Sequence, residues 1–178
     1  MSDEPVFSDT ADWTWVLERP CAQCGFDASS AHAYDVPNLL RANAFRWREI
    51  LAGDPDELRK RPRPDKWSPL EYAFHVRDVF ELYDHRLQLM LEEDAPHYEN
   101  WNQDETAVEK NYRAADPAVV SEELSDWAAR LAARFESVSG AQWQRTGYRS
   151  DGAAFTIDSF ARYFIHDPIH HLCDATIG

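Results

Sequence analysis

The sequence feature that most constrains the fold is a helix start at Trp67-Ser68-Pro69-Leu70-Glu71. Ser68 suits the N-cap, the proline after it suits the first helical position, and Glu71 completes a capping box. Apolar residues then follow at helical spacing as far as about Glu93, namely Leu70, Phe74, Phe80, Tyr83, Leu87 and Leu91. A long helix with one apolar face has to bury that face against other elements. We therefore expect this helix in the core of a helical protein.

Three further segments have the same amphipathic character. The first runs from about residue 35 to residue 51, with Asp35 as its cap. Another opens at Asp116-Pro117 and ends before residue 139, and the last begins after a cap at Thr156. Four such helices predict an all-α fold, arranged as a four-helix bundle.

Smaller features lie between and within these helices. Residues 103–111 suggest a short helix, and residues 141–155 form a loop with room for a short hairpin. Pro168 falls inside the last helix, where it removes one backbone hydrogen bond and crowds the carbonyl four residues earlier. We expect a kink near residues 164–168.

Composition excludes several classes of function. The chain has 178 residues, with 18 Lys and Arg against 32 Asp and Glu, so its formal charge is −14. A chain this acidic repels a phosphate backbone, which argues against nucleic acid as a partner. No apolar run is long enough to span a membrane, and the N-terminus does not have the pattern of a signal peptide. Three cysteines, an odd number, argue against a disulfide framework and favour a reducing cytoplasm.

Residues 1–34 differ from the rest and are expected to form an irregular N-terminal arm beside a bundle domain at residues 35–178. The arm begins with a polar tail over residues 1–10 and contains Cys21-Ala22-Gln23-Cys24-Gly25. A C-x-x-C followed by glycine is half of a zinc-ribbon site, with His32 as the nearest additional ligand. The alternatives are a redox dithiol and a plain turn with two reduced thiols.

The last helix carries a candidate metal site. His166 and His170 are four residues apart, so both rings lie on one helix face, with about 5–6 Å between their Cβ atoms. We expect the third ligand to be His75, near the start of the capped helix. Three histidines would leave coordination positions open, which is typical of catalytic sites. The set suits Zn, Ni or Fe. The alternative is three buried, hydrogen-bonded histidines without a metal.

Neighbouring residues are candidates for supporting roles. Asp174, four residues after His170, is an alternative metal ligand or a residue that hydrogen-bonds to a ligand. His171 is expected to pair with Asp167. Cys173 lies about 10 Å along the helix axis from His166, too far to share one ion with it.

Two segments together resemble a known family. Residues 66–78 resemble the W-S-x-x-E-x-x-x-H helix of the DinB/YfiT-like superfamily, and residues 158–171 resemble its closing H-x-x-x-H helix. The resemblance implies an up-down four-helix bundle, a divalent metal held by His75, His166 and His170, and frequent homodimers. Characterised members include transferases and isomerases that use bacillithiol, mycothiol or glutathione. The C-x-x-C arm is not part of the common family pattern.

These expectations lead to a ranked set of functions. The first is transfer of a low-molecular-weight thiol to an electrophilic small molecule, with the metal lowering the thiol pKa. The second is metal-dependent hydrolysis. The third is a non-catalytic, stress-related metal-binding bundle. No general base is evident in the sequence.

Overall fold

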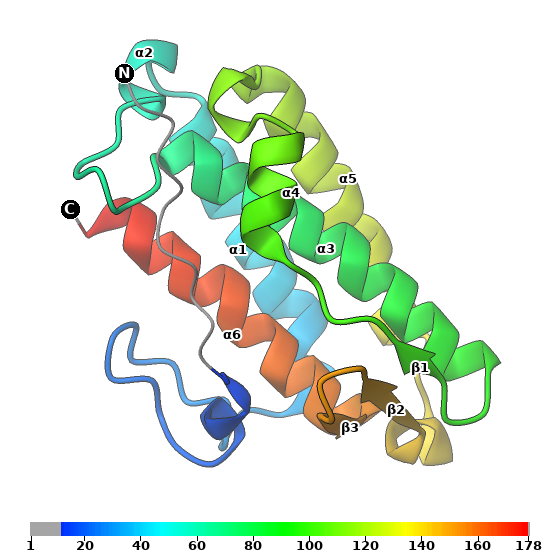
Figure 1. Ribbon diagram of the computed structural model, residues 1–178. Helices are drawn as coiled ribbons and strands as arrows, with labels where there is room; N and C mark the ends of the chain where they lie inside the picture. Colours follow the sequence, from blue (N-terminus) through cyan, green and yellow to red (C-terminus); the bar gives the residue numbers. More distant parts are fainter. Residues whose placement is uncertain (1–11, 178) are drawn as a thin grey trace.

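The computed structural model describes residues 12–177, so the predicted polar tail at residues 1–10 lies outside the described residues (Figure 1). Four long helices form the bundle: α1 (Val36–Leu51), α3 (Pro69–Glu92), α5 (Pro117–Glu136) and α6 (Ile157–Thr176). The shorter helical pieces are η1 (Thr14–Leu17), η2 (Ala33–Asp35), α2 (Pro55–Leu58), α4 (Gln103–Glu109), η3 (Tyr112–Ala114) and η4 (Gly140–Gln144). Three short strands complete the fold: β1 (His97–Tyr98), β2 (Thr146–Arg149) and β3 (Ala154–Thr156). The predicted all-α four-helix bundle is confirmed.

Local capping places the helix starts where the sequence predicts them. The backbone N–H of Glu71 donates to the Ser68 hydroxyl at 3.3 Å, and the N–H of Ser68 donates to the Glu71 carboxylate at 2.8 Å. Thr156 caps α6 in the same reciprocal way, and Asp116 caps α5. Asp35 departs from prediction: it precedes α1 but makes no cap hydrogen bond. Its backbone is already helical because η2 runs directly into α1, whereas a capping side chain requires an extended backbone.

The bundle contains one long crossover. Ion pairs Arg77–Glu123 and Asp84–Arg134 advance in the same direction along α3 and α5, so these two helices run parallel. Residues 93–116, which include β1, α4 and η3, carry the chain back from the end of α3 to the start of α5 (Figure 1). The direction of the helices therefore does not alternate at this connection, in contrast to a strict up-down bundle. Helices α1 and α3 each pack mainly on α5 and α6.

The core lies between the four long helices. Its largest fully buried side chains include aromatic residues from every long helix: Trp47, Phe80, Phe135, Phe160 and Phe164. Burial of rings of this size is the main source of stability in a bundle. Helix α6 continues through Pro168 without ending, and the Asn43 side chain of α1 donates to the Pro168 carbonyl at 2.9 Å.

A small sheet closes one end of the bundle. Strand β1 pairs in parallel with β2, and β2 pairs antiparallel with β3, which confirms the expected hairpin and extends it one residue past the predicted loop, to Thr156. The hairpin turns at Gly152, whose φ of +96° suits glycine. Gly147 packs so closely on Met90 of α3 that a Cβ there would lie 2.8 Å from the Met90 Cγ. None of the helices within residues 12–177 is long and apolar enough to cross a membrane.

The N-terminal arm lies along α6 (Figure 1). Val16 of η1 is buried, and so are Cys21, Ala28 and Ala33 farther along the arm. Arg162 of α6 donates from Nη1 to the Ala28 carbonyl at 3.3 Å. The arm therefore packs on the same helix that carries the predicted metal ligands.

Candidate metal centre

Helix α6 carries two pairs of potential ligands at i,i+4 spacing. His166 and His170 form one pair, and Asp167 and His171 form the other. Because consecutive residues of an α-helix point about 100° apart, the two pairs face different neighbours. The first pair faces the N-terminal arm, and the second faces α3.

The pair on the α3 side meets His75. One ligand atom from each of His75, Asp167 and His171 lies within 4.8 Å of the other two. The Nε2 atom of His75 is 3.4 Å from Oδ1 of Asp167, and the Nε2 atom of His171 is 3.7 Å from Oδ2. The His75 and His171 rings are perpendicular, with centroids 4.7 Å apart. We call these three residues the cavity group.

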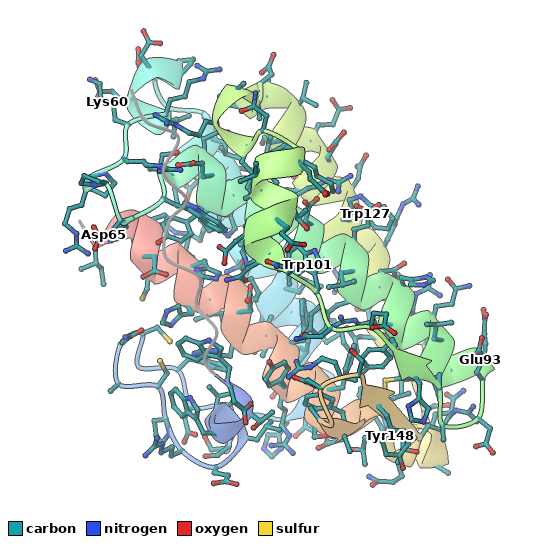
Figure 2. All side chains as sticks on the ribbon, viewed as in Figure 1. Lys60, Asp65, Glu93, Trp101, Trp127 and Tyr148 are labelled. Carbon is teal, nitrogen blue, oxygen red and sulfur yellow. The ribbon has the colours of Figure 1, made fainter. Side chains whose placement is uncertain are left out.

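His75 is completely buried in an aromatic setting. Its ring is stacked on Trp101 at 5.4 Å between centroids and lies 5.5 Å from Trp67. Trp101 belongs to the segment that enters α4 (Figure 2). Neither ring nitrogen of His75 has a hydrogen-bond partner among residues 12–177, and the same holds for Oδ1 of Asp167. Buried polar atoms without partners are costly, and a bound cation would satisfy them.

The electrostatics of the cavity group favour neutral imidazole and ionised carboxylate, the forms in which these groups bind metals. Burial lowers the pKa of His75, although Asp167 opposes this shift. Burial alone would raise the pKa of Asp167, but the adjacent His171 and His75 hold it well below its ordinary range.

His171 is held from outside the group. Its Nδ1 atom lies 3.0 Å from Oδ2 of Asp174, and its ring stacks on Tyr72 with centroids 5.2 Å apart. A carboxylate on the second ring nitrogen fixes the orientation of an imidazole ligand. Asp174 lies at this nitrogen of His171, and its Oδ2 atom is also 3.5 Å from Nε2 of His170.

The other pair on α6 meets the C-x-x-C of the arm. One ligand atom from each of Cys21, Cys24, His166 and His170 lies within 4.8 Å of the others. All the described cysteines are free thiols. Burial and the Cys21 thiol raise the pKa of Cys24 to about 11, and burial beside His170 lowers the pKa of His166 to about 4. We call these four residues the arm group.

A cavity of about 560 Å³ opens beside both groups. Its wall is formed by α3, the segment around Trp101, the hairpin, α6 and the start of the arm. Asp167 and His171 line it from the cavity group, and His166 and His170 line it from the arm group. Trp13 also lines it and packs on His166 and His170 at 5.6 and 5.2 Å between ring centroids.

Two guanidinium groups also line the cavity. Arg149 bonds to Asp151 through two atoms, each at 2.9 Å, and donates to the Tyr163 hydroxyl at 3.1 Å. Arg86 is buried and donates to the Glu99 carbonyl at 2.6 Å. The cavity therefore combines candidate metal ligands with two guanidinium groups, of which Arg149 is already paired with Asp151.

Comparison with known proteins identifies the family. The sequence pattern of the DinB superfamily matches residues 40–174, which is most of the chain. The chain belongs to the DinB superfamily. No curated protein sequence matches the chain. Among solved structures, this DinB chain resembles Bacillus subtilis YfiT with a TM-score of 0.67 and 19% sequence identity, over 93% of this chain and 82% of that one. That structure is described as a probable metal-dependent hydrolase with an unusual four-helix bundle topology.

The structure divides the predicted ligands of this DinB protein between two groups. His75 lies in the cavity group, whereas His166 and His170 lie in the arm group, so the three predicted ligands are not brought together in one of these groups. The predicted pairing of His171 with Asp167 is present at 3.7 Å. Asp167 and His171 have the same i,i+4 spacing as His166 and His170, and that spacing is the sequence signal for this second pair.

The remaining candidates are placed as follows. His32 stacks on Tyr34 and is not in the arm group. The Cys173 sulfur lies 3.9 Å from the Cys24 carbonyl oxygen, also outside that group. Cys21 and Cys24 lie next to α6, so they are not an isolated turn at the surface.

Proposed function

We propose that this protein is a metal-dependent enzyme of the DinB type, with the cavity group as its metal site. The observation that carries the proposal is the set of orphaned buried atoms on His75 and Asp167 beside a cavity lined by His171. Two imidazoles and one carboxylate are a donor set used by catalytic zinc and by non-haem iron. Three protein ligands leave positions open toward a substrate. The predicted choice of Zn, Ni or Fe is therefore retained.

A divalent ion at this group would lower the pKa of a water or thiol that binds it. The protein residues supply the rest of the site. Trp67 and Trp101 exclude water around His75, and Asp174 keeps the His171 ring in place. Asp167 offers negative charge from a side chain that is 34% exposed, so it faces both His75 and the cavity.

The nucleophile that we favour is a low-molecular-weight thiol. Such thiols commonly carry carboxylates, and the buried Arg86 provides a guanidinium on the cavity wall to meet one, beside Arg149, which already pairs with Asp151. A cavity of about 560 Å³ has room for a ligand of ordinary small-molecule size. In the transfer, the thiol releases its proton to solvent and the sulfur forms a C–S bond. With a halide substrate the halide ion leaves; with an epoxide the C–O bond opens and its oxygen takes up a proton from solvent to become a hydroxyl group.

Hydrolysis is the second candidate, supported by the description of the similar YfiT structure. It uses the same cavity and the same ligands, with water in place of the thiol. The two candidates differ in one requirement, the thiol cosubstrate.

The deciding experiment measures turnover of the zinc-, nickel- and iron-loaded protein with and without glutathione, bacillithiol or mycothiol. The substrates are an aryl halide, an epoxide and a panel of activated esters and amides. Thiol transfer predicts consumption of the halide or epoxide only when one thiol is present, and loss of that activity in His75→Gln. Cleavage of esters or amides without thiol would support hydrolysis. Turnover that is unchanged in His75→Gln and in Asp167→Asn would contradict both.

A further inference from the structure

We propose that Cys21, Cys24, His166 and His170 form a second, structural zinc site that fastens the N-terminal arm to α6. This site shares no ligand with the cavity group. Evidence for or against zinc at this site therefore does not decide the proposed enzymatic function.

The donor set has the composition and burial of a closed zinc site. Two thiolates and two imidazoles are a standard tetrahedral set for structural zinc. Cys21, His166 and His170 are buried, and Cys24 is partly buried. With four protein ligands, no position remains for a substrate, which distinguishes this group from the open cavity group.

The spacing of the ligand atoms fits one ion. Zn–S bonds of about 2.3 Å and Zn–N bonds of about 2.0–2.1 Å at tetrahedral angles place ligand atoms roughly 3.3–3.8 Å apart. The Cys21 sulfur lies 3.6 Å from Nδ1 of His170, within that range. All four ligand atoms lie within 4.8 Å of one another, so a small contraction completes the tetrahedron.

The backbone of the arm has the turn that such a site needs. The N–H of Gly25 donates to the Cys21 carbonyl at 2.8 Å, and the N–H of Cys21 donates to the Phe26 carbonyl at 3.0 Å. Gly25 has a φ of +75°, a left-handed conformation that favours glycine. This turn directs both sulfurs to the same side, toward α6.

An independent observation points to a ligand at this group. The Nε2 atom of His166 is buried and has no hydrogen-bond partner among residues 12–177. A metal ion at the arm group gives this buried imidazole the partner that the protein does not supply. Zn²⁺ binding would also displace the protons of both thiols, so two protons are released to solvent as two Zn–S bonds form.

The site has a consequence for the cavity. Trp13 packs on the rings of His166 and His170 and lines the cavity wall together with Asp12. Because the arm is anchored through these same histidines, zinc at the arm group holds that part of the wall in place.

The test uses cobalt as a spectroscopic substitute for zinc in the untagged, reduced full-length protein. We expect Co²⁺ to give intense visible bands typical of tetrahedral coordination and a near-ultraviolet charge-transfer band from thiolate sulfur. Zn²⁺ should displace the cobalt and abolish both. A loaded wild-type protein without the thiolate band would overturn the proposal, and this readout requires no variant.

Variants then assign the ligands. Cys21→Ser and Cys24→Ser should each lose the thiolate band and bind one zinc fewer per chain by elemental analysis. Cys173→Ser is the matched control, because it removes a nearby thiol outside the group, and it should retain both. His75→Gln should also retain the band, which separates this site from the cavity group.

The rate of limited proteolysis within the arm provides a second measurement of whether zinc anchors it. Chelation of the wild-type protein should speed limited proteolysis within residues 12–35 at least about tenfold, with re-addition of zinc reversing the effect. Equal cleavage rates with and without zinc would contradict the structural role.

Discussion

The Nε2 atom of His75 in α3 lies 3.4 Å from the Asp167 carboxylate in α6, yet it makes no hydrogen bond among the described residues. Buried polar atoms that approach without bonding, here Nε2 of His75 and Oδ1 of Asp167, are unusual, because each atom is shielded from water. A cation between them and His171 would remove this cost.

Asp167→Asn should weaken zinc binding at the cavity group by about 10- to 100-fold, because an amide cannot replace the negative charge of the ligand. The measurement is competition with a fluorescent chelator. Asp158→Asn is the control: Asp158 lies on the same helix but pairs with Arg162 at 3.0 Å, away from the group. Equal losses in both variants would show that Asp167 does not bind the metal.

The metal-free protein should lose stability as the pH falls from about 7 toward 5. Burial lowers the pKa of His75 below its ordinary value of about 6.5, so in this range the unfolded chain binds a proton that the folded chain does not. The midpoint of thermal unfolding in chelator, recorded against pH, should fall less steeply in His75→Gln. Parallel curves for the two proteins would exclude His75 as the source.

Tyr112→Phe should destabilise the protein by about 1.5–3 kcal/mol, the range for a hydrogen bond to a charged group. The buried Tyr112 hydroxyl donates to Oδ2 of Asp78 at 2.6 Å and ties η3 to α3. Urea unfolding measures the change. Tyr34→Phe, at a side chain that is 67% exposed, should change the free energy of unfolding by less than about 0.5 kcal/mol. Similar effects in the two variants would be inconsistent with the assigned bond.

Gly147→Ala should cost about 1–3 kcal/mol, because the added Cβ would lie 2.8 Å from Met90 Cγ and 3.1 Å from a ring carbon of Tyr98. Met90→Ala also destabilises by itself. The double variant should cost less than the sum of the two single changes, since the space left by the shortened Met90 side chain accepts the new methyl group. Additive costs by urea unfolding would argue against this contact.

The fold was largely predictable because its signals are local. Ser68 and Glu71 form their capping box within four residues, and Thr156 caps α6 through a residue three positions away. The apolar stripes and the hairpin turn at Gly152 are also read within a single element. The crossover was not predictable, because parallel packing of α3 on α5 depends on contacts between elements far apart in sequence.

Local sequence patterns do not decide which side chains of α6 share a metal site with His75. Spacing places His166 with His170 and Asp167 with His171 equally well, because both pairs are four residues apart on the same helix. Which pair faces α3 depends on how α6 is rotated about its axis. The core contacts of Phe164 with Phe80 and Tyr83 set that rotation, at 6.0 and 4.9 Å between ring centroids.

By itself, the sequence determined the four helices, their caps and a set of metal-binding side chains on α6, because each depends on residues within a few positions of one another. Only the tertiary structure decided that His75 meets Asp167 and His171, and that Cys21 and Cys24 meet His166 and His170. The reason is physical: a helix rotated by 100° exchanges one pair for the other, and packing across the whole bundle sets the rotation.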